Sequence, residues 1–500
     1  AGFYAQATGL TPVANVHVAP GLGNAIGMMY GCLKARVPVI VTAGQQDTRM
    51  RLRDPLLRHN LVEMAAPVVK WSAEPQSADE IGPMMRRAFQ IANEHPQGPV
   101  FIALPNNVME EETDIAASTS GTLTAAALPQ SETLQAIAER LIEAEKIAIC
   151  VGDDIAREHV TNEFLQLAEQ LGAAVFADFL LARRPIATDH PNFIRGLAAD
   201  ASQNRSMLAD YDAIVVLGGA TMEEIWFEPG SSLPERAYTV QIESDPRLLS
   251  VHRPVSNGIS GDLGAILIEL AQIVSTTAPA AAKARFEKNA AHLAERHAAN
   301  LAAQASRFEN QAGTTPMAAT EAMASLAEVM PDDVVIVDES ITASADVDRA
   351  FRKHNPDEFF AGRGGGIGQG IAGALGTAVA LPEKQILAIS GDGSAMYSIQ
   401  ALWTAAHHKL NIFFVILANA EYRVLQHNLD IHRQRFDAPS DQPYPNMDLI
   451  NPTLDFCGMA TGMGIATSRA ETTDDIIAAG ETYLNNGGPY LLEIAVAGKE

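Results

Sequence analysis

The stretch Ile386-Leu-Ala-Ile-Ser-Gly-Asp-Gly-Ser394 decides the fold of this chain. Its first five residues form a short apolar run that is typical of a buried strand. Gly391-Asp-Gly393 then predicts a turn that places one carboxylate at the carboxyl end of that strand. A helical stretch from Tyr397 to His408 follows, and a second apolar run, Asn411 to Leu417, leads into Asn419. Strand, helix and strand in this order predict a parallel α/β sheet, which binds ligands where its strands end.

Two oxygen-bearing side chains are expected to meet at that edge of the sheet. Asp392 and Asn419 lie 27 positions apart, and each follows one of two successive strands. A carboxylate and an amide oxygen suit Mg²⁺ when the phosphates of a ligand fill its remaining positions. Taken singly, an Asp in a turn and an Asn that caps a helix are both common. Taken together, at this spacing, they predict a metal site.

A glycine-rich segment precedes this pair. Seven glycines occur within residues 364–376, which suits either a backbone that approaches a ligand closely or tight packing of a helix on a strand. The spacing Gly368-x-Gly370-x-x-Gly373 also matches a dinucleotide-binding fingerprint, with Asp392 where a ribose-binding acid would stand. That alternative accounts neither for the glycines on both sides of Asp392 nor for Asn419.

Charge and composition exclude several classes of protein. The chain has 500 residues and a formal net charge of −25, which argues against nucleic acids and anionic membranes as partners. The three cysteines, Cys32, Cys150 and Cys457, have neither zinc-ligand nor disulfide spacing, which predicts a cytoplasmic protein. Residues 1–33 carry no Asp, Glu, Lys or Arg, but Pro12 and Pro20 interrupt them, so we interpret them as buried α/β core rather than a signal or membrane segment.

The order of apolar runs predicts three α/β units. We place them at residues 1–112, 132–275 and 313–500. An Ala-, Ser- and Thr-rich linker at 113–131 separates the first two, and an alanine-rich helical connector at 276–312 separates the last two. The strands expected in this order are Val13–Val18, Val37–Ala43, Val100–Leu104, Ile147–Val151, Ala174–Ala177, Ala213–Leu217, Tyr238–Glu243, Asp333–Val337 and Tyr490–Ala495, in addition to the two described above.

The segment from Gly391 to Asn419 resembles the diphosphate-binding motif of thiamine diphosphate (ThDP) enzymes. Val41-Thr-Ala-Gly-Gln-Gln46, Val69-Lys-Trp-Ser-Ala-Glu-Pro75 and Pro96-Gln-Gly-Pro-Val100 extend the likeness, over nearly the whole chain, to benzoylformate decarboxylases. The resemblance implies three doubly wound parallel-sheet domains: a pyrimidine-binding domain, a central domain and a diphosphate-binding domain. It also implies a Mg²⁺-dependent carbon–carbon lyase that decarboxylates a 2-oxo acid, and a dimer with shared active sites, usually a homotetramer.

Two other functions are compatible with the same resemblance. One is a carboligase of the acetolactate synthase type, which often carries FAD in its central domain. The other is a catalytically inactive protein with the ThDP fold.

The resemblance also assigns residues. Glu421 would offer its backbone carbonyl as a third Mg²⁺ ligand beside Asp392 and Asn419, and Ile367 would hold ThDP in a bent shape. The implied cofactor contacts are Ser340, Gly365, Gly366, Ile367, Gly391, Asp392, Gly393, Ser394, Asn419, Glu421 and Tyr422. The implied substrate pocket comprises Gln45, Gln46, Ile225, Val424 and Leu425. His17 would move substrate protons, although a structural His at the end of a strand is the alternative.

Several positions depart from the pattern of the family. The glutamate that activates ThDP would lie before Ala1, so we expect the first domain to be incomplete at its N-terminus. Ile225 stands where the family has a second histidine. After Asn419, the residues Arg423, His427 and Asn428 are more polar than a pocket for an aryl group requires. Arg423 is either a ligand for a substrate carboxylate or an exposed side chain.

Overall fold

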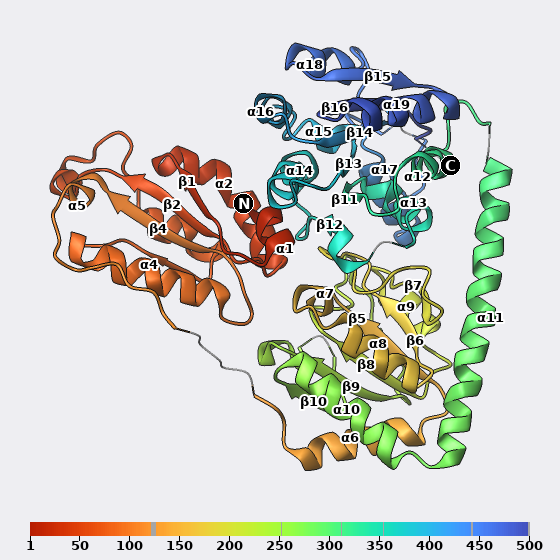
Figure 1. Cartoon of the computed structure of the whole chain (residues 1–500). Helices are drawn as coiled ribbons and strands as arrows, with labels where there is room; N and C mark the ends of the chain where they lie inside the picture. Colours follow the sequence, from red (N-terminus) through yellow and green to blue (C-terminus); the bar gives the residue numbers. More distant parts are fainter. Residues whose placement is uncertain (122–126, 252, 312, 354, 442–443, 499–500) are drawn as a thin grey trace. The chain divides into compact units, whose positions relative to one another are not determined.

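The computed structural model describes residues 1–121, 127–251, 253–311, 313–353, 355–441 and 444–498. Its strands form three sheets, and every pairing described between the named strands is parallel (Figure 1). The predicted α/β class with three parallel sheets is therefore confirmed. The chain divides into two compact units, one with the first and third sheets and the other with the central sheet. The domain boundaries at residues 112, 132, 275 and 313 stay predictions. Residues 122–126 of the expected linker lie outside the described residues.

The first sheet has the strand order β1-β2-β4-β3. Its strands are β1 (Val13–Val16), β2 (Ile40–Gln45), β3 (Trp71–Ala73) and β4 (Val100–Pro105), and its helices are α1 (Gly2–Thr8), α2 (Val18–Lys34), α3 (Leu61–Ala65), α4 (Ala78–Asn93) and α5 (Asn106–Met109). The prediction extended β1 to Val18, which instead begins α2, with Pro20 in its first turn, where proline is tolerated. It also began β2 too early, at Val37, because Pro38 cannot donate a hydrogen bond to a sheet.

The third sheet has the order β12-β11-β13-β14-β16-β15. Its strands are β11 (Val335–Glu339), β12 (Phe359–Ala361), β13 (Ile386–Gly391), β14 (Ile412–Ala418), β15 (Ala466–Ala470) and β16 (Tyr490–Ala495). Its helices are α12 (Ala319–Val329), α13 (Ser344–Ala350), α14 (Gln369–Ala380), α15 (Asp392–Ala395), α16 (Ala401–His408), α17 (Arg423–Arg435), α18 (Phe456–Gly462) and α19 (Thr473–Asn486). Helix α1 packs on α14, where Phe3 belongs to the hydrophobic core of this sheet. A Cβ atom added to Gly373 would lie 2.8 Å from the Phe3 ring, so a larger residue there would displace α1.

The central sheet has the order β10-β9-β8-β5-β6-β7. Its strands are β5 (Ile147–Val151), β6 (Ala174–Ala177), β7 (Phe193–Gly196), β8 (Ala213–Leu217), β9 (Tyr238–Glu243) and β10 (Asn257–Ser260). Its helices include α6 (Ser131–Glu143), α7 (Asp154–Arg157), α8 (Thr161–Gln170), α9 (Ala201–Met207) and α10 (Leu263–Thr277). Alternate residues of β5 enter two separate hydrophobic cores, with Ile149 in one and Cys150 in the other. Both faces of this sheet are therefore covered, as a doubly wound sheet requires.

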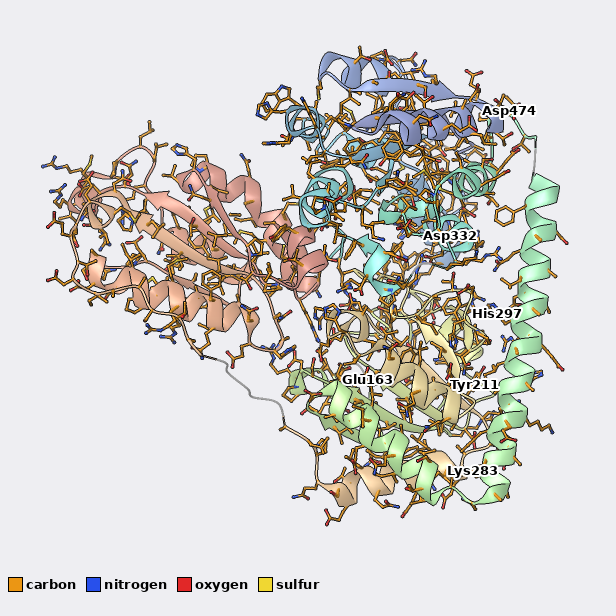
Figure 2. All side chains as sticks on the ribbon, in the orientation of Figure 1. Glu163, Tyr211, Lys283, His297, Asp332 and Asp474 are labelled. Carbon is orange, nitrogen blue, oxygen red and sulfur yellow. The ribbon has the colours of Figure 1, made fainter. Side chains whose placement is uncertain are left out.

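The expected connector is more than a spacer. Helix α11 (Ala280–Gln311) packs on the central domain through Phe286 and Leu293, which belong to its two cores. Figure 2 marks exposed Lys283 and buried His297 along this helix, so its two faces differ in exposure. The alanine-rich composition predicted the helix but not its buried face, which includes Ala282, Phe286, Leu293 and His297. Among the helices that the structure describes, none combines the length and apolar character needed to cross a bilayer.

Candidate cofactor and substrate site

The structure brings Asp392 against the loop that contains Asn419. Strands β13 and β14 are neighbours in register, with Gly391 opposite Leu417. The Asp392 carboxylate accepts a hydrogen bond from the backbone N–H of Gly393 at 2.7 Å and another from Ala420 at 2.7 Å. The predicted turn is a short helix, α15, and the helix expected from Tyr397 begins at Ala401. The two halves of the motif therefore lie at one carboxyl edge.

The Asp392 carboxyl is buried, which disfavours its charged form. Its side chain is 4% exposed, and burial raises its pKa to about 6 although backbone N–H groups act in the opposite direction. A nearby cation would favour the charged form of such a carboxyl. Beside it, the Asn419 amide oxygen accepts a hydrogen bond from the Glu421 N–H at 3.0 Å. Glu421 Oε1 is buried without a hydrogen-bond partner among the described residues.

The residues at this edge fit a Mg²⁺ ion and a diphosphate. Asp392, Asn419 and Glu421 provide hard oxygen atoms, the kind of ligand that Mg²⁺ prefers. A Cβ atom added to Gly365 or Gly391 would meet nothing within 4 Å, so space lies open beside both backbones. A Cβ atom at Gly393 would lie 2.8 Å from the Tyr422 ring, so that glycine is required by the close approach of Tyr422.

Two residues that sequence reasoning missed fix the glycine-rich loop. The Glu339 carboxylate accepts hydrogen bonds from the N–H groups of Gln369 at 2.8 Å and Gly370 at 2.9 Å, at the start of α14. Burial raises the pKa of Glu339 to about 7. The Gln369 amide donates to the carbonyl of Gly366 at 2.6 Å, which holds the turn that precedes Ile367, a half-buried residue.

The structure of this loop gives separate reasons for several of the glycines that the sequence analysis left open between ligand approach and tight packing. A Cβ atom at Gly370 would lie 2.7 Å from the Glu339 Cβ atom, so tight packing explains this glycine, as it does Gly373. Gly364, Gly365 and Gly368 have φ values of 86°, 72° and 90°, a left-handed region that glycine enters at little cost. The dinucleotide fingerprint therefore arises here from glycines with separate packing and backbone reasons.

Ser340 and Ser394 are both buried. The Ser340 hydroxyl donates to an Asp338 carboxylate oxygen at 2.6 Å, and its backbone N–H donates to the same oxygen at 2.9 Å. The prediction ended β11 at Val337, whereas Asp338 and Glu339 complete it. These two acidic residues tolerate a strand position because backbone and hydroxyl donors satisfy them.

His17 lies at the corresponding edge of the first sheet. It caps α2, its side chain makes no capping hydrogen bond, and it is exposed. Because Val16 pairs with Ala43, His17 and Gln45 leave neighbouring strands at one edge. The Gln45 amide donates to the carbonyl of His59 at 2.8 Å and accepts from the Gln46 N–H at 2.9 Å. Asp392 follows a strand of a different sheet.

Strained backbone lies next to the predicted site residues. Among the described residues, Val18 (φ 37°) and Ile341 (φ 54°) are the β-branched residues with positive φ. Val18 follows His17 and Ile341 follows Ser340, each just past the carboxyl end of a strand. Ala420, between Asn419 and Glu421, has φ 59°. Such strain costs about 1–3 kcal/mol per residue and concentrates at functional sites.

The predicted substrate-pocket residues outside the first sheet are exposed to different degrees. Ile225 is 59% exposed on a loop of the central domain, and Val424 and Leu425 are 36% and 46% exposed on the first turn of α17. Arg423 is half-buried, and its Nη1 atom has no hydrogen-bond partner among the described residues. The exposed-side-chain alternative for Arg423 is therefore wrong.

The carboxyl edge of the central sheet is closed by its own side chains. The loops after β5 and β8 are joined, because the Gly152 N–H donates to the Leu217 carbonyl at 2.9 Å. Buried carboxylates accept from backbone N–H groups there: Asp153 from Ala182 at 3.1 Å, Asp178 from Met222 at 3.1 Å and Glu243 from Gly219 at 2.9 Å. Backbone donors of this kind bind the pyrophosphate of a dinucleotide in related folds.

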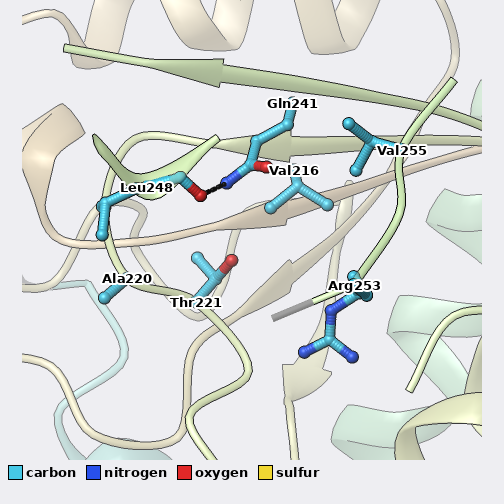
Figure 3. Close-up of a pocket in the computed structure, with 8 residues that line it drawn as sticks. Val216, Ala220, Thr221, Gln241, Leu248, Arg253 and Val255 are labelled. Carbon is cyan, nitrogen blue, oxygen red and sulfur yellow. Dashed lines mark hydrogen bonds between the residues drawn. The ribbon is translucent and has the colours of Figure 1, made fainter. Parts of the chain in front are cut away.

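A pocket of about 20 Å³ lies beside this edge. Residues of β8, β9 and the loops that follow them line it, among them Thr221, Gln241 and Arg253 (Figure 3). The Gln241 amide donates to the Leu248 carbonyl at 3.1 Å across it. Such a volume holds about one water molecule.

Comparison with known proteins agrees with this geometry. The chain matches the N-terminal thiamine pyrophosphate (TPP) binding domain of TPP enzymes at residues 1–65, their central domain at 134–270 and their C-terminal TPP binding domain at 341–494. It is 28% identical to benzoylformate decarboxylase from Pseudomonas aeruginosa over 495 residues, which cover 98% of this chain and 88% of that protein. It is 24% identical to the acetolactate synthase isozyme 2 large subunit of Escherichia coli, covering 99% of this chain and 85% of that one.

A solved structure extends the likeness to three dimensions. A provisionally assigned thiamin diphosphate-dependent enzyme from Mycobacterium smegmatis is 30% identical, with a TM-score of 0.84 over 99% of this chain and 89% of that one. The predicted resemblance is confirmed, and this chain belongs to the thiamine pyrophosphate enzymes, within the group that contains benzoylformate decarboxylases and acetolactate synthases.

Proposed function

We propose that this protein decarboxylates a 2-oxo acid without oxidation, using ThDP and Mg²⁺, and releases the aldehyde and CO₂. Benzoylformate is the reference substrate, because the likeness to benzoylformate decarboxylase spans 98% of the chain. The observation that carries the proposal is the hydrogen bond from Ala420 to Asp392, which joins the two halves of the diphosphate motif. We place the protein in the cytoplasm, with neither nucleic acid nor membrane as a partner.

The diphosphate half of the site has a role for each assigned residue. Asp392, Asn419 and the carbonyl of Glu421 would hold Mg²⁺, and Ile367 would support the cofactor from the loop that Glu339 and Gln369 fix. The remaining contacts would come from Ser340, Gly365, Gly366, Gly391, Gly393, Ser394 and Tyr422. When bound, ThDP supplies a carbanion and then an electron sink.

His17 would transfer the protons. An imidazole donates and accepts protons near neutral pH, and the exposed position of His17 at the start of α2 leaves its ring accessible. Because His17 and Asp392 belong to different sheets, we propose that a second subunit completes each active site and that the assembly is a homotetramer. Gln45 and Gln46 would line the substrate side of this shared site.

The central domain favours decarboxylation over the flavin-carrying synthase alternative. Its backbone donors at the carboxyl edge are bonded to Asp153, Asp178 and Glu243, and carboxylates there would repel the phosphates of FAD. The alternatives that remain are a carboligase that needs no flavin and an inactive ThDP-binding protein.

A product analysis tests this proposal. The holoenzyme with ThDP and Mg²⁺ is expected to release CO₂ from 2-oxo acids such as benzoylformate, in equal amount to the aldehyde. Chromatography of the products separates aldehydes from 2-hydroxy ketones and acetohydroxy acids, and an absorption spectrum reports any flavin. Carboligation products in excess over aldehyde would overturn decarboxylation as the main reaction, and bound ThDP without CO₂ release would support the inactive alternative.

Replacing Ile341 with Gly is expected to lower activity with little change in stability. Glycine adopts positive φ freely, but the variant also loses chain stiffness and a side chain that is 42% exposed, so the free energy of unfolding should change by less than about 1 kcal/mol. Turnover should fall severalfold, because the turn that follows Ser340 is then less fixed. Denaturant unfolding and steady-state kinetics measure the two effects. Lys409→Gly is the matched control: Lys409 also has positive φ, at the end of α16, and its variant should likewise change little in stability, with unchanged turnover.

A further inference from the structure

A polar pocket opens at the edge of the first sheet where His17 lies. Its volume is about 260 Å³, and Gln45 and Gln46, which follow β2, form one side. Four further lining residues follow the short 3-10 helix Thr48–Arg53, namely Arg58, His59, Asn60 and Val62. The lining residues are Gln45, Gln46, Arg51, Arg58, His59, Asn60, Val62, Glu74 and Gln76.

The pocket is cationic in a strongly acidic protein. Arg51 pairs with Glu74 at 2.7 Å, and Glu74 is the one carboxylate of the lining. Arg58 has neither a side-chain hydrogen bond nor an acidic partner among the described residues, and it is half-buried. One guanidinium charge is therefore left uncompensated, in a chain whose net charge is −25.

The chemistry of the lining suits an anion rather than an aryl ring. Val62 is the one aliphatic residue of the lining, whereas pockets for aromatic ligands are mainly apolar. The Gln45 amide is already bonded to His59 and Gln46, which positions the two glutamine side chains at the edge of the sheet. A guanidinium binds a carboxylate through two parallel hydrogen bonds, and Arg58 is placed to do so.

A 2-oxo acid already has one carboxylate, but a cation suits it poorly in this reaction. That carboxylate loses its charge as it becomes CO₂, so a cation that binds it stabilises the ground state more than the transition state. A second anionic group, which keeps its charge throughout, carries no such disadvantage. Resting on the proposed function, we infer that the substrate is a 2-oxo acid with a second carboxylate, which Arg58 binds in this pocket.

A pair of substrates with equal chain length tests the inference in the holoenzyme. The value of kcat/KM should be at least about tenfold higher for 2-oxoglutarate than for 2-oxopentanoate, which lacks the second carboxylate. Arg58→Gln should lower this ratio about 10- to 100-fold, the usual effect of losing a charged hydrogen bond. Arg53→Gln is the control, because Arg53 is exposed at the end of the 3-10 helix that precedes this segment and does not line the pocket. In this control, the ratio of kcat/KM for 2-oxoglutarate to that for 2-oxopentanoate should match the ratio of the parent.

Binding without turnover separates this inference from the proposed function. Ligand-observed NMR should detect glutarate, but not the uncharged glutaramide, on the parent protein, and Arg58→Gln should abolish the glutarate signal. If neither oxo acid is decarboxylated but glutarate binding depends on Arg58, the proposed function fails and the anion pocket stands. If 2-oxopentanoate is decarboxylated at least as well as 2-oxoglutarate, or if Arg58→Gln changes neither the ratio nor binding, the inference is overturned.

Discussion

Replacing Asp392 with Asn is expected to weaken ThDP binding in the presence of Mg²⁺ by at least about 100-fold. The substitution preserves the size of the side chain but removes the anionic oxygen that would bind the metal. The carboxylate accepts hydrogen bonds from two backbone N–H groups, those of Gly393 and Ala420. In the Asn variant, the amide NH₂ group would face one of these two donors. Calorimetric titration of ThDP, with and without Mg²⁺, measures the loss.

The stability of the cofactor-free protein should change in the opposite direction. Burial raises the pKa of Asp392 to about 6, so the folded state retains a proton that the unfolded state releases between about pH 4 and 6. This carboxyl therefore favours folding at low pH and loses that contribution as the pH rises through 6. At pH 8 the Asn variant, which carries no charge, should unfold at a temperature equal to or above that of the parent.

A second buried carboxylate of the same sheet provides the control. Glu493, on β16, accepts a hydrogen bond from the Cys457 N–H at 3.2 Å and pairs with Arg469 at 3.2 Å. Glu493→Gln should lower stability and leave the affinity for ThDP unchanged. An Asp392→Asn variant that binds ThDP with the parent's Mg²⁺ dependence would exclude the metal role.

Replacing His17 with Ala is expected to slow turnover by ~10²–10⁴, the usual contribution of a positioned acid–base group, while ThDP remains bound. The physical reason is the position of the ring: exposed, without a capping hydrogen bond, and directly before the strained Val18. Steady-state and single-turnover kinetics on the parent's best substrate measure the change.

Two comparisons show whether His17 acts chemically. His17→Gln, which retains bulk and hydrogen bonding but cannot gain a proton at neutral pH, should be nearly as slow as His17→Ala. His408→Ala, at an exposed position on α16, should turn over like the parent. Turnover of His17→Ala within threefold of the parent would make this residue structural.

Local pattern was sufficient for much of the fold. The bounds of β5, β6, β8, β9 and β16 match the sequence prediction, because β5, β6 and β8 are fully apolar runs and β9 and β16 are rich in aromatic and aliphatic residues. The errors have local causes as well. Pro38 delays β2, and the polar residues Asp338 and Glu339 hide the end of β11 from any hydrophobicity pattern.

Part of the candidate site could also be predicted from the sequence, and part could not. Asp392 and Asn419 could be found because parallel strands place their carboxyl ends together, so sequence order alone brings the two loops to one edge. Glu339 could not be found, because its partners, Gln369 and Gly370, lie 30 and 31 positions away. That carboxylate accepts hydrogen bonds from the N–H groups at the start of α14 only because α14 packs in front of β11. The pocket around Arg58 likewise depends on how an irregular segment folds back on β2.

The insertion of Phe3 beside Gly373 has a consequence for how the protein can be divided. A side chain from the first α/β unit fills part of the core of the third, so the third unit lacks a complete hydrophobic interior by itself. The two cofactor-binding domains should therefore behave as one cooperative folding unit, whereas the central domain, with α11 packed on its cores, has an interior of its own. A recombination boundary that exchanges the diphosphate domain between relatives would have to exchange α1 with it.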